Sequence, residues 1–129
     1  MAAFDENLKR MGTDFIDLYL IHWPVKNYYL DAWREMEKIY QSGRVRAIGV
    51  SNFTINHLQD VLQICEVKPA VNQVEFHPEL IQPDLLKFCK KNQIQLEAWS
   101  PLMQGMNNLH KQKLYVIGNA EQLTSRKFK

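Results

Sequence analysis

The sequence predicts an α/β fold in which parallel strands alternate with helices. Short apolar runs begin near residues 15, 45, 70 and 94, and between them apolar residues recur every three or four positions. The strand starts are roughly 24 to 30 residues apart and each gap holds one helix, which is the spacing of right-handed βα units. We therefore expect four such units within the 129 residues.

The first unit begins with a predicted helix over residues 2–11. Phe4 and Leu8 lie near helical spacing, and Gly12 follows as a stop signal. Residues 15–21 are then almost continuously apolar, a pattern typical of parallel-sheet strands that are covered on both faces. We expect the first strand to be buried on both sides.

The second unit starts with a helix that ends at Ser42 and Gly43. One face of this helix is predicted to consist of Tyr29, Trp33, Met36 and Tyr40. Residues 44–50 follow as the second strand, and Thr54 is the expected N-cap of the next helix. The apolar face of that helix is formed by Ile55, Leu58, Val61, Leu62 and Cys65.

The third strand is predicted over residues 70–76 and the fourth over residues 94–99. Pro83 stands in the first turn of the helix between them, where its missing N–H removes no helical hydrogen bond. This helix is expected to bury Leu85, Leu86 and Cys89 and to expose Lys87, Lys90 and Lys91.

Charge and composition argue against several classes of protein. The net charge is +2, from 16 basic and 14 acidic residues that are interspersed through most of the chain, which gives no footprint for nucleic acid. No apolar run reaches the roughly 18 residues of a membrane span, and the segment MAAFDENLKR lacks the apolar core of a secretory signal. Cys65 and Cys89 lie among apolar residues and are interpreted as buried thiols. We expect a cytoplasmic protein that binds neither nucleic acid nor membranes.

Two parallel architectures fit the alternation, a doubly wound sheet and a (β/α)8 barrel. A doubly wound nucleotide-binding sheet would normally open with a glycine-rich turn. The sequence contains neither GxGxxG nor GxxxxGKS/T. The barrel is therefore favoured, and four units amount to a partial TIM barrel.

The predicted strand ends carry polar and aromatic side chains. In chain order they are His22, Trp23, Ser51, Asn52, Gln73, Trp99 and Ser100. In a barrel these ends meet at one mouth. Serine, asparagine and glutamine can bind an amide, tryptophan offers a stacking surface, and a neutral imidazole can donate one hydrogen bond to a polarised oxygen. The set is suited to holding a planar ring with a carboxamide beside a carbonyl.

Metal-dependent hydrolysis and serine hydrolysis are the alternatives. The sequence has no HxH, HExxH or CxxC pattern, and Glu75 with His77 gives two potential ligands where zinc takes three or four. Ser51 lacks the GxSxG turn of a hydrolase nucleophile. We expect no metal site, and we interpret His77 as structural and His57 as a surface residue.

Four segments, in this order, resemble the central part of the aldo/keto reductase family: FIDLYLIHWP, RVRAIGVSNF, VNQVEFHP and EAWSPL. The resemblance covers about residues 2–105 and is strongest over residues 44–53. It implies reversible, NADPH-linked reduction of an aldehyde or ketone to an alcohol. By the same resemblance, His22 matches the histidine that orients the substrate carbonyl, and Trp23 matches a wall of the substrate pocket.

The resemblance further implies NADP(H) as cofactor. Six residues match family contacts to it: Ser51, Asn52, Gln73, Trp99, Ser100 and Leu102. The first three match residues that hydrogen-bond the nicotinamide carboxamide, and Trp99 matches the aromatic position on which the nicotinamide ring stacks. The last two match contacts near the pyrophosphate.

The sequence departs from the family in two places. The family's proton donor is a tyrosine, helped by a lysine and an aspartate, and no residue here matches them. Without that acid, hydride transfer is expected to lose a factor of about 10² to 10⁴. Residues 106–129 do not align with the family pattern. We expect a partial barrel domain over residues 1–105 and a divergent tail over 106–129, which a truncated or frame-shifted gene would explain.

Two interpretations of function stay open. The chain is either an oxidoreductase of impaired activity on a small carbonyl substrate, or a non-catalytic fragment or interaction module derived from such an enzyme. An open four-stranded sheet also leaves two unpaired edges, which invite pairing with another chain. We therefore expect self-association or low solubility.

Overall fold

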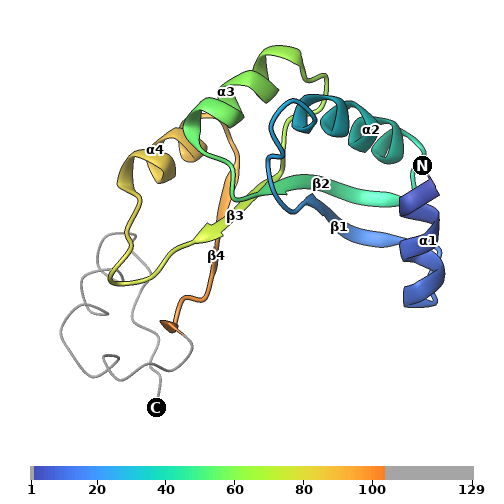
Figure 1. The fold of residues 1–129 in the computed structure, drawn as a ribbon, viewed down its shortest axis with the longest axis horizontal. Helices are drawn as coiled ribbons and strands as arrows, with labels where there is room; N and C mark the ends of the chain where they lie inside the picture. Colours follow the sequence, from blue (N-terminus) through green and yellow to red (C-terminus); the bar gives the residue numbers. More distant parts are fainter. Residues whose placement is uncertain (1, 104–129) are drawn as a thin grey trace.

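The computed structural model describes residues 2–103 (Figure 1). Its elements are α1 (Ala2–Met11), β1 (Ile16–Ile21), α2 (Tyr29–Gln41), β2 (Val45–Ser51), α3 (Ile55–Ile64), β3 (Val71–Glu75), α4 (Pro83–Lys91) and β4 (Gln95–Trp99). The predicted alternation of helices and strands is confirmed, with only small differences at the element ends. The expected tail over residues 106–129 lies outside the described residues. Over the described range, no helix has the length and apolar character needed to cross a membrane.

The four strands form one parallel sheet in the order β1-β2-β3-β4. Ile16 pairs with Val45 across β1 and β2, and Val71 pairs with Gln95 across β3 and β4. In Figure 1, helices α2, α3 and α4 follow one another along the same side of the curved sheet. A doubly wound sheet would reverse its strand order and place helices on both faces. The sequential order and the single helical layer are those of a segment of a (β/α)8 barrel, as predicted.

The apolar core lies between β2 and the helical layer. Val45, Ile48 and Val50 of β2 are at most 3% exposed. Trp33 of α2 and Leu58 of α3 belong to the same core cluster and are fully buried. In the described sheet β2 and β3 each have a paired strand on both sides, and β2 contributes more buried apolar residues to the core than β3 does.

Two helices bury slightly different residues from those predicted. On α2, Ile39 is buried, whereas Tyr40 is 38% exposed. These residues follow Met36 by three and four positions, so they lie on either side of the same helical face, and the packing of α2 selects the first. On α4, Leu86 is only half-buried, although Leu85 and Cys89 are buried as expected.

β1 is less covered than its continuous apolar sequence predicts. None of its six residues is fully buried in the described structure. Tyr19 and Ile21 pack against the core, while Leu18 and Leu20 alternate to the opposite face of the sheet. We call that side, which α2, α3 and α4 do not cover, the open face. In the described structure, the prediction that β1 is buried on both sides is therefore wrong. Helices cover only one face of the sheet, and β1 is an edge strand that pairs only with β2.

Gly49 allows the three strands β1, β2 and β3 to pack closely on the open face. A Cβ atom at this position would lie 2.7 Å from the carbonyl oxygen of Val71 and 2.8 Å from Cδ2 of Leu20. The first of these atoms is backbone of the adjacent strand and cannot move away without disturbing the ladder. The requirement for glycine at position 49 is therefore steric.

We predict that Gly49→Ala lowers the free energy of unfolding by about 2 kcal/mol, the middle of the range for overpacked cores. Gly43→Ala is the matched control, since a Cβ there meets nothing within 4 Å and only its φ of 74° opposes a side chain. That left-handed strain is worth about 1 kcal/mol. Urea denaturation followed by tryptophan fluorescence measures both. If Gly49→Ala is no less stable than Gly43→Ala, the steric explanation is wrong.

Candidate functional site

The carboxyl ends of the four strands lie at the same edge of the sheet, because all pairings are parallel. Ser51 at the end of β2 is in register with Gln73 of β3. Glu75 at the end of β3 is in register with Trp99 of β4. The structure therefore brings together residues that are far apart in the sequence, as the strand-end prediction requires.

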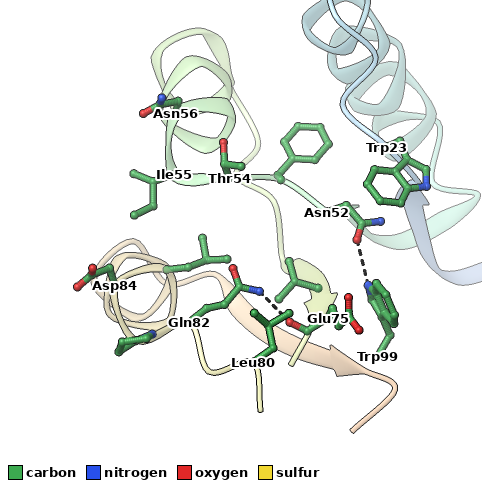
Figure 2. A pocket seen from close by; sticks show the side chains of 14 residues that line it. Trp23, Asn52, Thr54, Ile55, Asn56, Glu75, Leu80, Gln82, Asp84 and Trp99 are labelled. Carbon is green, nitrogen blue, oxygen red and sulfur yellow. Dashed lines mark hydrogen bonds between the residues drawn. The ribbon is translucent and has the colours of Figure 1, made fainter. Parts of the chain in front are cut away.

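Asn52 connects three of the strand ends. It follows β2 directly and has a left-handed backbone, with φ of 62°. Its Nδ2 donates to the carbonyl oxygen of His22, 3.0 Å away, and to Oγ of Ser51, 3.1 Å away. Its Oδ1 accepts a hydrogen bond of 3.0 Å from the indole Nε1 of Trp99 (Figure 2). One side chain thus joins the ends of β1, β2 and β4.

Ser51 and Gln73 continue this network into β3. Oγ of Ser51 and the backbone N–H of Asn52 both donate to the carbonyl oxygen of Gln73, each at 2.8 Å. Nε2 of Gln73 donates to Oε1 of Glu97, also at 2.8 Å. Within residues 2–103, Oε1 of Gln73 accepts no hydrogen bond. We call Ser51, Asn52, Gln73 and Trp99 the strand-end cluster.

A cavity of about 670 Å³ opens beside the strand-end cluster, which is within the usual range for small-molecule sites. It is lined by Trp23, Asn52, Phe53, Thr54, Ile55, Asn56, Val74, Glu75, Leu80, Gln82, Pro83, Asp84, Leu85 and Trp99. Figure 2 shows Trp23, Asn52 and Trp99 at one end of the cavity, and Asn56 and Asp84 at the other. Three of the predicted site residues therefore share one cavity.

Five predicted site residues are absent from this lining: His22, Ser51, Gln73, Ser100 and Leu102. The backbone carbonyl of His22 is held by Asn52, but its side chain is exposed. The imidazole centroid lies 6.1 Å from the ring of Trp23. The structure therefore fixes the backbone of His22 beside the cavity and leaves its ring in solvent.

Ser100 and Leu102 lie in a short turn after β4. Ser100 has φ of 52°, a region that is uncommon for residues other than glycine and asparagine. Its carbonyl oxygen accepts a hydrogen bond of 2.9 Å from the N–H of Met103. The side chain of Leu102 is 57% exposed. Strained backbone of this kind tends to cluster at functional sites. Here the strained residue Ser100 directly follows Trp99, and the strained residue Asn52 directly follows Ser51.

Sequence reasoning missed the half of the cavity that belongs to the helices. Thr54 and Asn56 lie at the start of α3, and Gln82 and Asp84 at the start of α4. Nε2 of Gln82 donates to the carbonyl oxygen of Glu75 at 2.8 Å, which ties α4 to the end of β3. A signal was present, since Thr54 and the adjacent Pro83 already marked helix starts. In βα units these starts lie at the same end as the strand ends.

His57, predicted as a surface residue, is partly exposed and also has a structural role. It is half-buried, and its ring packs edge-on against Tyr29 and Phe53, with centroids 5.2 and 5.7 Å away. Its Nδ1 lies 3.3 Å from the backbone nitrogen of Thr54 and 3.1 Å from Oγ1 of the same residue. His57 therefore helps to cap α3, in the position that glutamate or glutamine takes in a capping box.

The charged groups of the lining are carboxylates. The described lining contains Glu75 and Asp84, and no lysine or arginine. Oε1 of Glu75 lies 3.2 Å from Nε2 of His77. Nδ1 of His77 accepts from the N–H of Glu79 at 3.3 Å, so the neutral ring carries its hydrogen on Nε2, facing Glu75. These contacts agree with a structural role for His77. Across residues 2–103, no three His, Cys, Asp or Glu side chains gather closely enough to bind a metal.

Comparison with known proteins identifies relatives over most of the chain. The model of the aldo/keto reductase family matches residues 1–128. A glyoxal reductase of Bacillus subtilis is 59% identical over 105 residues, which are 81% of this chain and 38% of that protein. Methylglyoxal reductase DkgA of Salmonella typhimurium is 43% identical over 114 residues, which are 87% of this chain and 42% of that protein. The chain thus spans about two fifths of the length of these relatives.

Solved structures match the fold. An aldo-keto reductase from a Medee basin deep-sea metagenome library has a TM-score of 0.81 and 44% identity, over 94% of this chain and 46% of that one. An aldo-keto reductase of Bombyx mori in complex with NADP has a TM-score of 0.77 and 30% identity, over 94% of this chain and 45% of that one. The family match, these relatives and the shared fold agree. The chain belongs to the aldo/keto reductase family.

Proposed function

We propose that the protein to which this chain belongs reduces a small aldehyde or ketone to an alcohol with NADPH. The observation that carries the proposal is the strand-end cluster beside a cavity. There the hydroxyl of Ser51, the amide of Asn52 and the indole of Trp99 are hydrogen-bonded in a chain, and the backbone carbonyl of Gln73 joins them. The printed names of two relatives, a glyoxal reductase and a methylglyoxal reductase, support small carbonyl compounds as substrates.

The strand-end cluster has the hydrogen-bonding groups that a nicotinamide carboxamide needs. A carboxamide offers two N–H donors and one carbonyl acceptor. Gln73 uses one of its two Nε2 hydrogens on Glu97, which leaves one N–H and Oε1 for a ligand. Oδ1 of Asn52 keeps a second lone pair beyond its bond from Trp99. When bound, NADPH supplies the hydride that reduces the carbonyl carbon.

The charge distribution of the cavity favours one orientation of the cofactor. Glu75 and Asp84 would repel phosphate groups. We place the pyrophosphate by the turn that holds Ser100 and Leu102, outside the carboxylate-lined cavity. The face of the Trp99 ring then provides the stacking surface between that turn and the amides of the strand-end cluster.

His22 and Trp23 form the proposed substrate side. A neutral imidazole can donate one hydrogen bond to a carbonyl oxygen and so polarise it. The ring of His22 is exposed beside Trp23, which lines the cavity. Asn52 holds the backbone carbonyl of His22 beside the cavity, and we propose that rotation about the side-chain bonds of His22 aims its imidazole at a substrate oxygen.

The proton that completes the alcohol has no evident donor among residues 2–103. The hydroxyl of Tyr29 donates to the carboxylate of Asp60. This hydrogen bond, with burial and the nearby charge, raises the pKa of Tyr29, which makes it a weaker acid. Tyr19 accepts a hydrogen bond from Asn7, 2.8 Å away, and its ring packs against Phe4. We propose that the 129-residue chain by itself is weakly active. The alternative is that it is a non-catalytic module.

Both cysteines are free thiols, and this supports a reducing compartment. Burial raises the pKa of the thiol of Cys65 and of Cys89, so the reactive thiolate is disfavoured at both positions. Cys89 is fully buried. We place the protein in the cytoplasm as part of the same proposal.

Titration with NADPH tests the proposed cofactor site. We expect NADPH to quench the fluorescence of Trp99, and Gln73→Ala to weaken binding about fivefold, the effect of one lost hydrogen bond. Trp23→Phe shows how much of the signal comes from the other indole of the cavity.

Turnover with a nitrobenzaldehyde, followed at the nicotinamide absorbance, is expected to be at least about 100-fold slower than for a full-length relative. Quenching without turnover would favour the non-catalytic alternative, and absence of quenching would contradict the cofactor site.

Tyr29→Phe tests the assignment of Tyr29 to stability rather than chemistry. Below about pH 10 the substitution should lower the free energy of unfolding by about 1 kcal/mol, through loss of the bond to Asp60. Since the folded pKa is raised, the phenol contributes stability that is complete below the unfolded pKa and is lost as the pH rises through the folded pKa. The difference in unfolding free energy between Tyr29→Phe and wild type, measured by urea denaturation, should therefore shrink in strong alkali. Tyr28→Phe, at an exposed position, should not differ from wild type. A difference that is constant with pH would contradict the assignment.

Self-association is expected of the 129-residue chain. In the described sheet, β1 and β4 are edges, and Leu18 lies half-exposed on the open face. Size-exclusion chromatography with light scattering should detect dimers or larger species. Leu18→Lys should reduce them, whereas Gln63→Lys, on the exposed surface of α3, should not. A wild-type chain that elutes as a clean monomer would contradict the expectation.

A further inference from the structure

The backbone strain of Asn52 is offset by hydrogen bonds of its side chain. Its φ of 62° lies in the left-handed region, which asparagine tolerates better than most residues but still less easily than glycine. Strained conformations of this kind persist where the surrounding contacts over-determine them. At Asn52 those contacts are three hydrogen bonds of the side-chain amide, to His22, Ser51 and Trp99.

The chemistry of the partners fixes which way the amide points. The indole N–H of Trp99 can only donate, and the backbone carbonyl oxygen of His22 can only accept. Both are satisfied only when Oδ1 faces Trp99 and Nδ2 faces His22, as observed. A rotation of the amide by 180° would set two donors against each other at Trp99 and two acceptors at His22. The indole N–H of Trp99 and the carbonyl of His22 therefore jointly fix the orientation of the Asn52 amide.

We propose that the indole N–H of Trp99 is a positioning group for the site, acting through Asn52 on the backbone of His22. The proposal rests on the function proposed above and adds a role that stacking alone does not give. A phenylalanine at position 99 would offer a ring face without a donor. The indole therefore provides the stacking surface and also fixes the amide that is to bind the cofactor and the strand end that carries His22.

Hydrogen exchange of the indole N–H tests the positioning contact without any cofactor. In the ¹⁵N-labelled full chain, the Nε1–H signal of Trp99, assigned by its loss in Trp99→Phe, should be protected from solvent exchange. Asn52→Gly keeps a comfortable left-handed backbone but removes the amide, so protection should fall at least about fivefold, as for one lost hydrogen bond. Equal exchange rates in wild type and Asn52→Gly would overturn the proposal.

Asn52→Asp is the matched variant that tests the hydrogen bond from Asn52 to the carbonyl oxygen of His22. Aspartate also tolerates the left-handed region, and its oxygen still accepts from the indole, but it cannot donate to His22. Protection of the Trp99 signal should therefore survive in Asn52→Asp, while the backbone amide resonances around His22 shift as they do in Asn52→Gly. Loss of Trp99 protection in Asn52→Asp would mean that the indole N–H is not held by an oxygen at this position, against the proposal.

Binding of NADPH tests the consequence for function. Trp99→Phe and Asn52→Gly should each weaken binding about fivefold or more. If the two residues act as one unit, the double variant should bind about as weakly as the weaker single variant, because coupled contacts are not additive. If the fold-losses in NADPH affinity of the two single variants multiply in the double variant, the proposed coupling of Trp99 and Asn52 is wrong. Absence of NADPH binding in wild type would refute the proposed function, whereas the exchange experiment would still decide whether Trp99 positions Asn52.

Discussion

The hydrogen bonds of the Asn52 side chain are the constraint on which the geometry of the site depends. The ladder between β2 and β3 reaches Ser51 and Gln73 and goes no further. Beyond that point, the backbone N–H of Asn52 still bonds the carbonyl oxygen of Gln73 on β3. Its side chain adds the contacts to the ends of β1 and β4, by bonding the carbonyl of His22 and the indole of Trp99. A single left-handed residue thus extends the order of the sheet to its functional edge.

The unequal covering of the two sheet faces explains why polar groups can gather at that edge. The helical layer buries the apolar side of β2, so the core is built on one face. On the other face, Gly49 leaves room for the side chain of Leu20 and the backbone of Val71. Two residues nearer the strand end, the paired residues Ser51 and Gln73 are polar. The apolar core and the polar side chains of Ser51 and Gln73 therefore lie on opposite sides of the same strands.

The first turns of α3 and α4 contribute as much to the cavity as the strand ends do. His57 caps the start of α3 through Thr54, and Gln82 holds the start of α4 to the end of β3. The carboxylates of Glu75, at the end of β3, and Asp84, at the start of α4, give the cavity a negative character. Within the described lining, the cavity is consequently unfavourable to phosphates.

The sequence by itself determined the elements, the parallel alternation and the strand-end residues, because these depend on local periodicity and on caps such as Thr54 and Pro83. It could not decide whether Ile39 or Tyr40 faces the core, since both lie on the same helical face and only the packing of α2 separates them. It also missed the capping role of His57, the open face of β1 and the helical half of the cavity. The bond between Trp99 and Asn52 joins residues 47 positions apart. Such a contact depends on strand order and register, which arise only when the whole sheet assembles, and so the tertiary structure alone decided it.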